Sequence, residues 1–77
     1  MSIENVNWTR TCCEWHGDYA EHPLIGGGVA RLKRSPTAPG VVLVCRFGAD
    51  NRAIDTDGDG VPAYVEMTEA EASALLV

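Results

Sequence analysis

A turn rich in proline and glycine constrains this fold most, because it separates two apolar segments that can return on each other. Residues 35–40 read Ser-Pro-Thr-Ala-Pro-Gly. Two prolines cannot donate to a strand ladder, and Gly40 relaxes the backbone. The flanking segments, 29–34 and 41–47, have the composition of strands. The second alternates Val41, Leu43, Cys45 and Phe47 against Val42, Val44 and Arg46. The sequence therefore predicts a β-hairpin with a long loop.

A third strand and a helix are expected after this hairpin. Residues 61–67 alternate Ala63, Val65 and Met67 against Tyr64 and Glu66, as a half-buried strand does. Thr68 and Glu71 have the spacing of a capping box, which begins a helix over residues 68–77. The predicted fold class is α+β: a three-stranded antiparallel sheet over residues 29–67 with a C-terminal helix packed on one face.

The N-terminal third shows no regular period. We expect residues 1–7 to form a loose arm and residues 8–28 to form an irregular segment rich in Cys, His and Trp, which ends in three glycines. With 77 residues, the chain is long enough for one small domain, residues 1–77.

Charge is distributed unevenly along the chain. The net charge is −5, and residues 50–77 hold seven acids against one base, Arg52. Such an acidic C-terminal face attracts cations or a basic partner, so no nucleic-acid partner is expected.

The longest wholly apolar run, residues 41–45, is far shorter than the roughly 20 residues of a membrane span. The start of the chain lacks the features of a signal peptide, and the cysteine count of three is odd. We therefore expect a cytoplasmic protein without a membrane partner.

The acidic segment 55–66 has the spacing of a twelve-residue calcium loop. In that pattern Gly60 supplies the sharp turn, and the oxygens come from Asp55, Asp57, Asp59, the Val61 carbonyl and Glu66. Residues 55–64 also resemble the calcium-binding repeats of the thrombospondin type 3 kind, which implies calcium at the three aspartates. The alternative is a hairpin that needs no metal, because Asp-Gly steps favour turns. A calcium-binding module is thus one hypothesis for the function.

A cluster of potential zinc ligands lies near the N-terminus. Cys12, Cys13, His16 and His22 fall within eleven residues, and zinc accepts Cys sulfur and His nitrogen. The hypothesis is a zinc-stabilised domain held by Cys12, His16 and His22, with Glu14, Asp18 or Cys45 as a fourth ligand. The alternative is ordinary buried cysteines beside exposed histidines. No carboxylate is identifiable that would orient a Cys/His pair for catalysis, so the sequence does not predict an enzyme.

The layout of the whole chain resembles a group of short uncharacterised proteins from actinobacteria and their phages. The resemblance is carried by the cluster Trp8, Cys12, Trp15, His16 and His22, by strand 41–47, and by the strand–Thr–helix ending of residues 64–72. It implies a non-enzymatic accessory or regulatory protein, of a kind that a phage could encode. The leading hypothesis for the function is a small module that binds a partner protein, with a homo-oligomer also open. The expected interface uses Trp8, Trp15 and Tyr19 as aromatic anchors, or the acidic C-terminal face.

Overall fold

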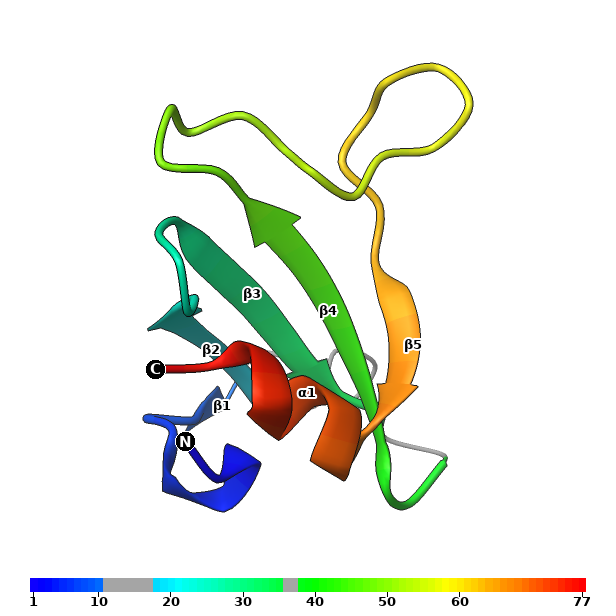
Figure 1. The fold of residues 1–77 in the computed structure, drawn as a ribbon. Coiled ribbons are helices and arrows are strands. Elements are labelled where there is room, and N and C mark those ends of the chain that lie inside the picture. The colour runs from blue at the N-terminus through cyan, green and yellow to red at the C-terminus, as the bar shows by residue number, and fades with distance from the viewer. Residues whose placement is uncertain (11–17, 36–37) are drawn as a thin grey trace.

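A computed structural model of the chain describes residues 1–10, 18–35 and 38–77. In these residues five strands form one antiparallel sheet in the order β1-β2-β3-β4-β5 (Figure 1). A short 3-10 helix precedes the sheet, and an α-helix follows it. In chain order the elements are η1 (Ile3–Asn5), β1 (Thr9–Arg10), β2 (Asp18–Pro23), β3 (Val29–Arg34), β4 (Val41–Phe47), β5 (Val65–Thr68) and α1 (Glu69–Leu75).

The predicted class, α+β with an antiparallel sheet and a C-terminal helix, is confirmed. Strands β3 and β4 have the predicted bounds. Helix α1 begins after Thr68, whose hydroxyl accepts from the Glu71 amide while the Glu71 carboxylate accepts from the Thr68 amide. The prediction of three strands was wrong, because β1 and β2 extend the sheet into the segment expected to be irregular. Strand β2 is held in register by β3, with Ala20 opposite Leu32.

Residues 1–7 do not form a loose arm. Ile3 and Val6 are buried in the core, 2% and 5% exposed. The Met1 amino group donates to the Leu76 carbonyl at 2.8 Å, and the Ile3 amide donates to Ser73 Oγ at 2.8 Å. The start of the chain is therefore hydrogen-bonded to α1 and to Leu76, the residue that follows this helix (Figure 1).

The strand expected over residues 61–67 begins later, at Val65, and ends at Thr68. The residues before it form a small hairpin of their own, in which Thr56 bridges Pro62 and the Ala63 amide donates to the Asp55 carbonyl at 3.0 Å. We call residues 55–63 the acidic hairpin. Because these residues pair with one another, they do not pair with β4.

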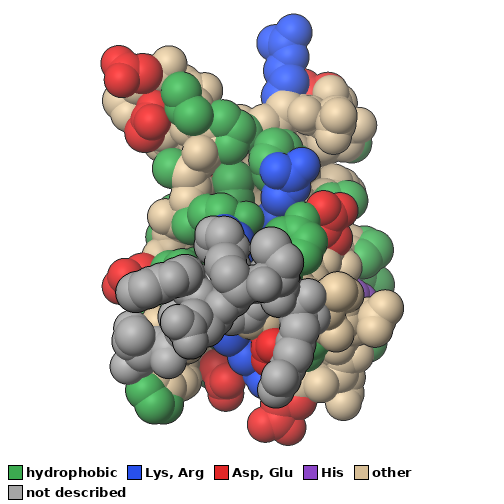
Figure 2. Space-filling model, turned by 180° about the vertical axis from the view of Figure 1, so that it is seen from behind, with side chains coloured by type: hydrophobic (Ala, Val, Ile, Leu, Met, Phe, Trp, Pro, Cys, Tyr) green, Lys and Arg blue, Asp and Glu red, His purple; other side chains and the backbone are tan. Residues whose placement is uncertain are grey.

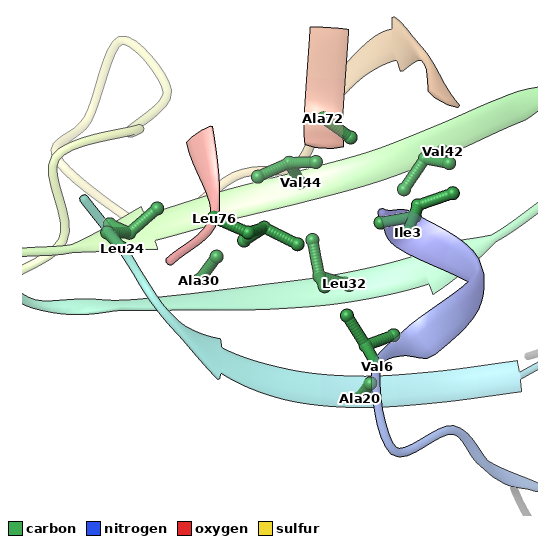
Figure 3. Packing of buried hydrophobic residues seen from close by; sticks show 10 residues of the cluster. All are labelled: Ile3, Val6, Ala20, Leu24, Ala30, Leu32, Val42, Val44, Ala72 and Leu76. Carbon is green, nitrogen blue, oxygen red and sulfur yellow. The ribbon is translucent and has the colours of Figure 1, made fainter. Parts of the chain in front are cut away.

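The core lies between the sheet and α1 (Figure 3). Residues directly opposite each other on paired strands share a face. Leu32 of β3 lies opposite Val44 of β4, and both are fully buried beneath Ala72 and Leu76. The whole cluster is Ile3, Val6, Ala20, Leu24, Ala30, Leu32, Val42, Val44, Ala72 and Leu76, with Trp8, Met67 and Leu75 packed against it.

The triglycine segment 26–28 is a tight turn between β2 and β3, and all three glycines have positive φ. At Gly28 a side chain would also collide with the Phe47 carbonyl, so this position requires glycine. In the described part of the chain, no helix is long and apolar enough to cross a membrane.

Candidate functional site

Helix α1 covers only part of its face of the sheet (Figure 1). A groove lies between the helix and the loops that follow β2 and β4. Two adjoining hollows, of about 330 and 430 Å³, form this groove. Both are lined by Arg46 of β4, by Ala74 and by Leu75 of α1. The shared lining makes them one continuous depression along the helix, which we call the helix groove.

The walls of the helix groove carry large apolar side chains that remain exposed. Ile25, Ile54 and Val65 line it with exposures of 65%, 52% and 44%. Each comes from a different segment: the turn after β2, the loop after β4, and the first position of β5. Isolated exposed apolar residues are common on proteins, but their convergence on one depression is typical of binding surfaces.

The backbone fixes each of these side chains in place. The Ile25 amide donates to the Leu75 carbonyl at 2.9 Å, which ties the triglycine turn to the end of α1. The Ile54 amide donates to the Arg46 carbonyl at 2.7 Å. Val65 lies opposite Val44 in the sheet and therefore points to the side of α1. The groove is thus built by main-chain pairing and is already formed in this structure.

Arg46 lines both hollows of the groove and is bound to Asp55. The Arg46 guanidinium donates to both Asp55 oxygens, at 3.0 and 2.9 Å, and the Arg46 amide donates to Oδ2 at 2.9 Å. The Asp55 side chain is only 9% exposed, whereas that of Arg46 is 39% exposed. The guanidinium hydrogen bonds lower the pKa of Asp55 below its ordinary value, and the same bonds raise that of Arg46. The pair holds the acidic hairpin against β4.

The charge left at the rim of the groove is negative. Asp55 and Glu71 line the larger hollow beside Arg46. Asp55 neutralises Arg46, and Glu71 accepts from the Thr68 amide, which lowers its pKa and keeps it ionised. Further acidic side chains lie at the outer end of the acidic hairpin (Figure 2). What the groove offers a ligand is therefore apolar surface bordered by carboxylates.

Three of the five predicted calcium ligands, Asp55, Asp57 and the Val61 carbonyl, are engaged within the protein. Both Asp55 oxygens bind Arg46, and Asp57 Oδ1 accepts from the amides of Asp59 and Val61 at 2.8 and 3.0 Å. The Val61 carbonyl accepts from the Asp57 amide, and Glu66 lies on β5 opposite Leu43. Residues 55–63 form the hairpin that was the alternative expectation. Among residues 1–10, 18–35 and 38–77, no group of three or more His, Cys, Asp or Glu could hold a metal ion. Calcium binding stays a prediction, and it would require Asp55 to leave Arg46.

The predicted zinc cluster falls mostly outside the described residues. Cys12, Cys13, Glu14 and His16 belong to the undescribed stretch 11–17. His22 lies on β2, where its Nε2 is 3.2 Å from the Val77 carbonyl. Cys45 lies on β4 and is buried, with its Sγ 3.7 Å from the Asp55 carbonyl. The zinc hypothesis also stays a prediction.

The predicted aromatic anchors are divided between different parts of the fold. Trp15 lies outside the described residues. Trp8 packs against the core, its Nε1 donates to the Ile3 carbonyl at 2.9 Å, and Arg34 lies over its ring at 4.6 Å. Tyr19 is half-buried on β2 and donates to the Glu21 carboxylate, and burial raises its pKa to about 12. Trp8 and Tyr19 thus make contacts within this chain.

The described part of the opposite side of the molecule carries both hydrophobic and charged side chains (Figure 2). Its cations lie on rings: Arg31 is 4.6 Å from the centroid of Phe47, and Lys33 is 4.8 Å from that of Tyr64. Arg31 Nε also lies 3.6 Å from Glu21. Arg31 is thus held by Phe47 and Glu21, and Lys33 by Tyr64, all within this chain.

Sequence reasoning did not identify the residues of the helix groove. One signal was present: the strand alternation places Arg46 on the same face as Val42 and Val44, so it is a charged residue on a buried face. A charge in that position needs a partner, which the structure supplies as Asp55. Ile25 and Ile54 carried no periodic signal, because each is a single apolar residue in a loop.

Comparison with protein-family models, with curated proteins and with solved structures finds no match to this chain. The function is therefore inferred from the groove and its charges.

Proposed function

We propose that this protein is a non-catalytic interaction module, an accessory or regulatory protein that binds a segment of a partner protein in the helix groove. The observation that supports it is the convergence of Ile25, Ile54 and Val65, each 44–65% exposed, on one depression of the surface. Interfaces of this kind bury an apolar centre within a polar border. The helix groove has that arrangement.

The other candidate surfaces support docking less well. Trp8 is half-buried against the core and Tyr19 is bound to Glu21, so neither projects as an anchor. The acidic C-terminal face contributes to the proposal as the border of the groove rather than as a separate site. The same acidity disfavours a nucleic-acid partner.

We also propose that the protein is located in the cytoplasm, which is a reducing compartment. Cys45 is a free thiol on β4 and is 2% exposed. Burial raises its pKa, which keeps it protonated and unreactive at neutral pH. A small apolar core residue is the role that fits it.

The test is a selection of binders from a random peptide library displayed against the whole protein. Selected peptides are then titrated into isotope-labelled protein while the side-chain methyl shifts are followed by NMR. We expect the largest shifts at Ile25, Ile54 and Val65. The double substitution Ile54→Ser with Val65→Ser removes two exposed anchors without opening the core, and it should weaken binding by about tenfold or more.

A matched control uses two exposed valines that do not line the groove. Val29 and Val61 are 38% and 55% exposed. Val29→Ser with Val61→Ser removes a similar amount of apolar surface and should leave the affinity unchanged. Equal loss in both double variants, or shifts centred on the opposite face of the sheet, would contradict the proposal.

A further inference from the structure

The charges around the helix groove restrict which partner it can accept. Of the three ionisable residues that line it, Asp55 and Glu71 are acidic and only Arg46 is basic. The charge of Arg46 is matched by Asp55 at 2.9 Å, so one uncompensated carboxylate remains. The two elements that contribute these carboxylates, the acidic hairpin and α1, also carry Asp57, Asp59 and Glu69, which do not line the groove. An apolar ligand entering this groove therefore meets Glu71 as its unmatched charge, on a chain segment that is acidic.

On this basis we propose that the helix groove takes a basic amphipathic segment of a partner protein, with apolar side chains against Ile25, Ile54 and Val65 and Lys or Arg side chains against the carboxylates. The inference rests on the proposed function and specifies the chemistry of the partner. Lys or Arg side chains on the partner would be attracted to the acidic border of the groove, which increases the association rate. Acidic segments would be repelled by the same border and would bind less well.

A second copy of the chain is a poorer occupant. Each copy carries a net charge of −5, and seven of its acids lie in residues 50–77, the part that supplies much of the groove. Two such faces brought together would place carboxylates against carboxylates in a partly desolvated contact, where their repulsion is stronger than in water. A basic segment relieves that repulsion.

Two synthetic peptides test the charge preference. One is a short amphipathic peptide of leucine and lysine, and the other has glutamate at every lysine position with the leucines unchanged. Fluorescence anisotropy with the whole protein should give at least about tenfold tighter binding of the leucine–lysine peptide. That affinity should fall as salt is raised, because the charges are exposed to solvent. The methyl shifts should again centre on Ile54 and Val65.

Two neutralising variants serve as the matched pair. Glu71→Gln removes a carboxylate from the groove but keeps a residue that can complete the capping box. It should weaken binding of the leucine–lysine peptide by about two- to threefold. Glu4→Gln, on η1 and exposed, removes a carboxylate that does not line the groove and should have no effect. Equal weakening by both variants would show general attraction to an acidic protein and overturn the inference.

Failure of the inference is distinguishable from failure of the proposed function. Equal or tighter binding of the leucine–glutamate peptide in the groove would overturn the charge preference and leave partner docking intact. Dimers in sedimentation that dissociate on Ile54→Ser substitution would also overturn it, with a second copy as the occupant. If neither these peptides nor any library peptide shifts the methyls of the groove, the proposed function itself is wrong.

Discussion

A single residue, Asp55, links the acidic hairpin to the sheet. Its folded pKa lies below its ordinary value of 3.8, chiefly because Arg46 donates to it. The folded protein therefore binds this proton more weakly than the unfolded chain does. The resulting stabilisation is fully present above the unfolded pKa and is lost as the pH falls through the folded pKa.

Because folding lowers the pKa of Asp55, we predict that Asp55→Asn destabilises the protein at neutral pH and that this loss of stability is smaller at acidic pH. The loss at neutral pH should be about 1–2 kcal/mol, the scale of a charged hydrogen bond reduced by the solvent exposure of Arg46. The difference between wild type and variant should narrow as the pH falls below about 4. Urea unfolding across this range measures it. Asp59→Asn, at an exposed position of the same hairpin, is the control, and an Asp55→Asn difference that is constant with pH would contradict the argument.

The sequence identified Asp55 as an important residue, but not as the partner of Arg46. A run of aspartates at alternate positions predicts shared cation ligands when only neighbours in the chain are considered. The competing partner, Arg46, lies nine residues earlier on a strand, and its pairing with Asp55 depends on how the loop returns to β4. Spacing along the chain shows which side chains are able to bind a cation. It does not show that a cationic side chain such as Arg46 lies next to one of them in the fold.

At the scale of elements, the acidic hairpin holds its shape through its own hydrogen bonds. Asp57 Oδ1 accepts from two amides, and Arg46 occupies both oxygens of Asp55. We therefore predict that the thermal unfolding midpoint is the same in calcium and in chelator, because binding stabilises a fold only when a ligand site is free. A midpoint that rises with calcium, and no longer rises after Asp59→Asn, would instead establish the calcium-binding module.

The elements that sequence reasoning placed well are those whose signals are local. Strands β3 and β4 carry their own apolar alternation, and α1 carries its capping box, so each was predicted close to its observed bounds. Strand β2 lacks such a signal: its buried residue is the small Ala20, and it includes Asp18 and Pro23, which are uncommon in strands. It forms because β3 pairs with residues 19–23, which is a tertiary effect.

At the scale of the whole molecule, both ends of the chain close on the same side of the sheet (Figure 1). Leu76 bridges Leu24, and its carbonyl accepts from the Met1 amino group at 2.8 Å. The Val77 amide donates to the Pro23 carbonyl at 3.2 Å. This closure completes the core at the end of α1. It also sets one wall of the helix groove, since the neighbouring Leu75 carbonyl holds Ile25.

Leu76 is a buried residue of this closure, so its side chain should contribute strongly to stability. Leu76 is 1% exposed and lies among Leu24, Ala30 and Leu32, so Leu76→Ala leaves a cavity and should cost about 2–5 kcal/mol. A domain of this size is stabilised by roughly 4–12 kcal/mol in total, so the variant should unfold at a much lower temperature or denaturant concentration. Val77→Ala is the matched control, because Val77 is 64% exposed and keeps its backbone bond to Pro23. Urea unfolding of both variants decides it: a Leu76→Ala loss no larger than that of Val77→Ala would mean that the chain folds without this closure.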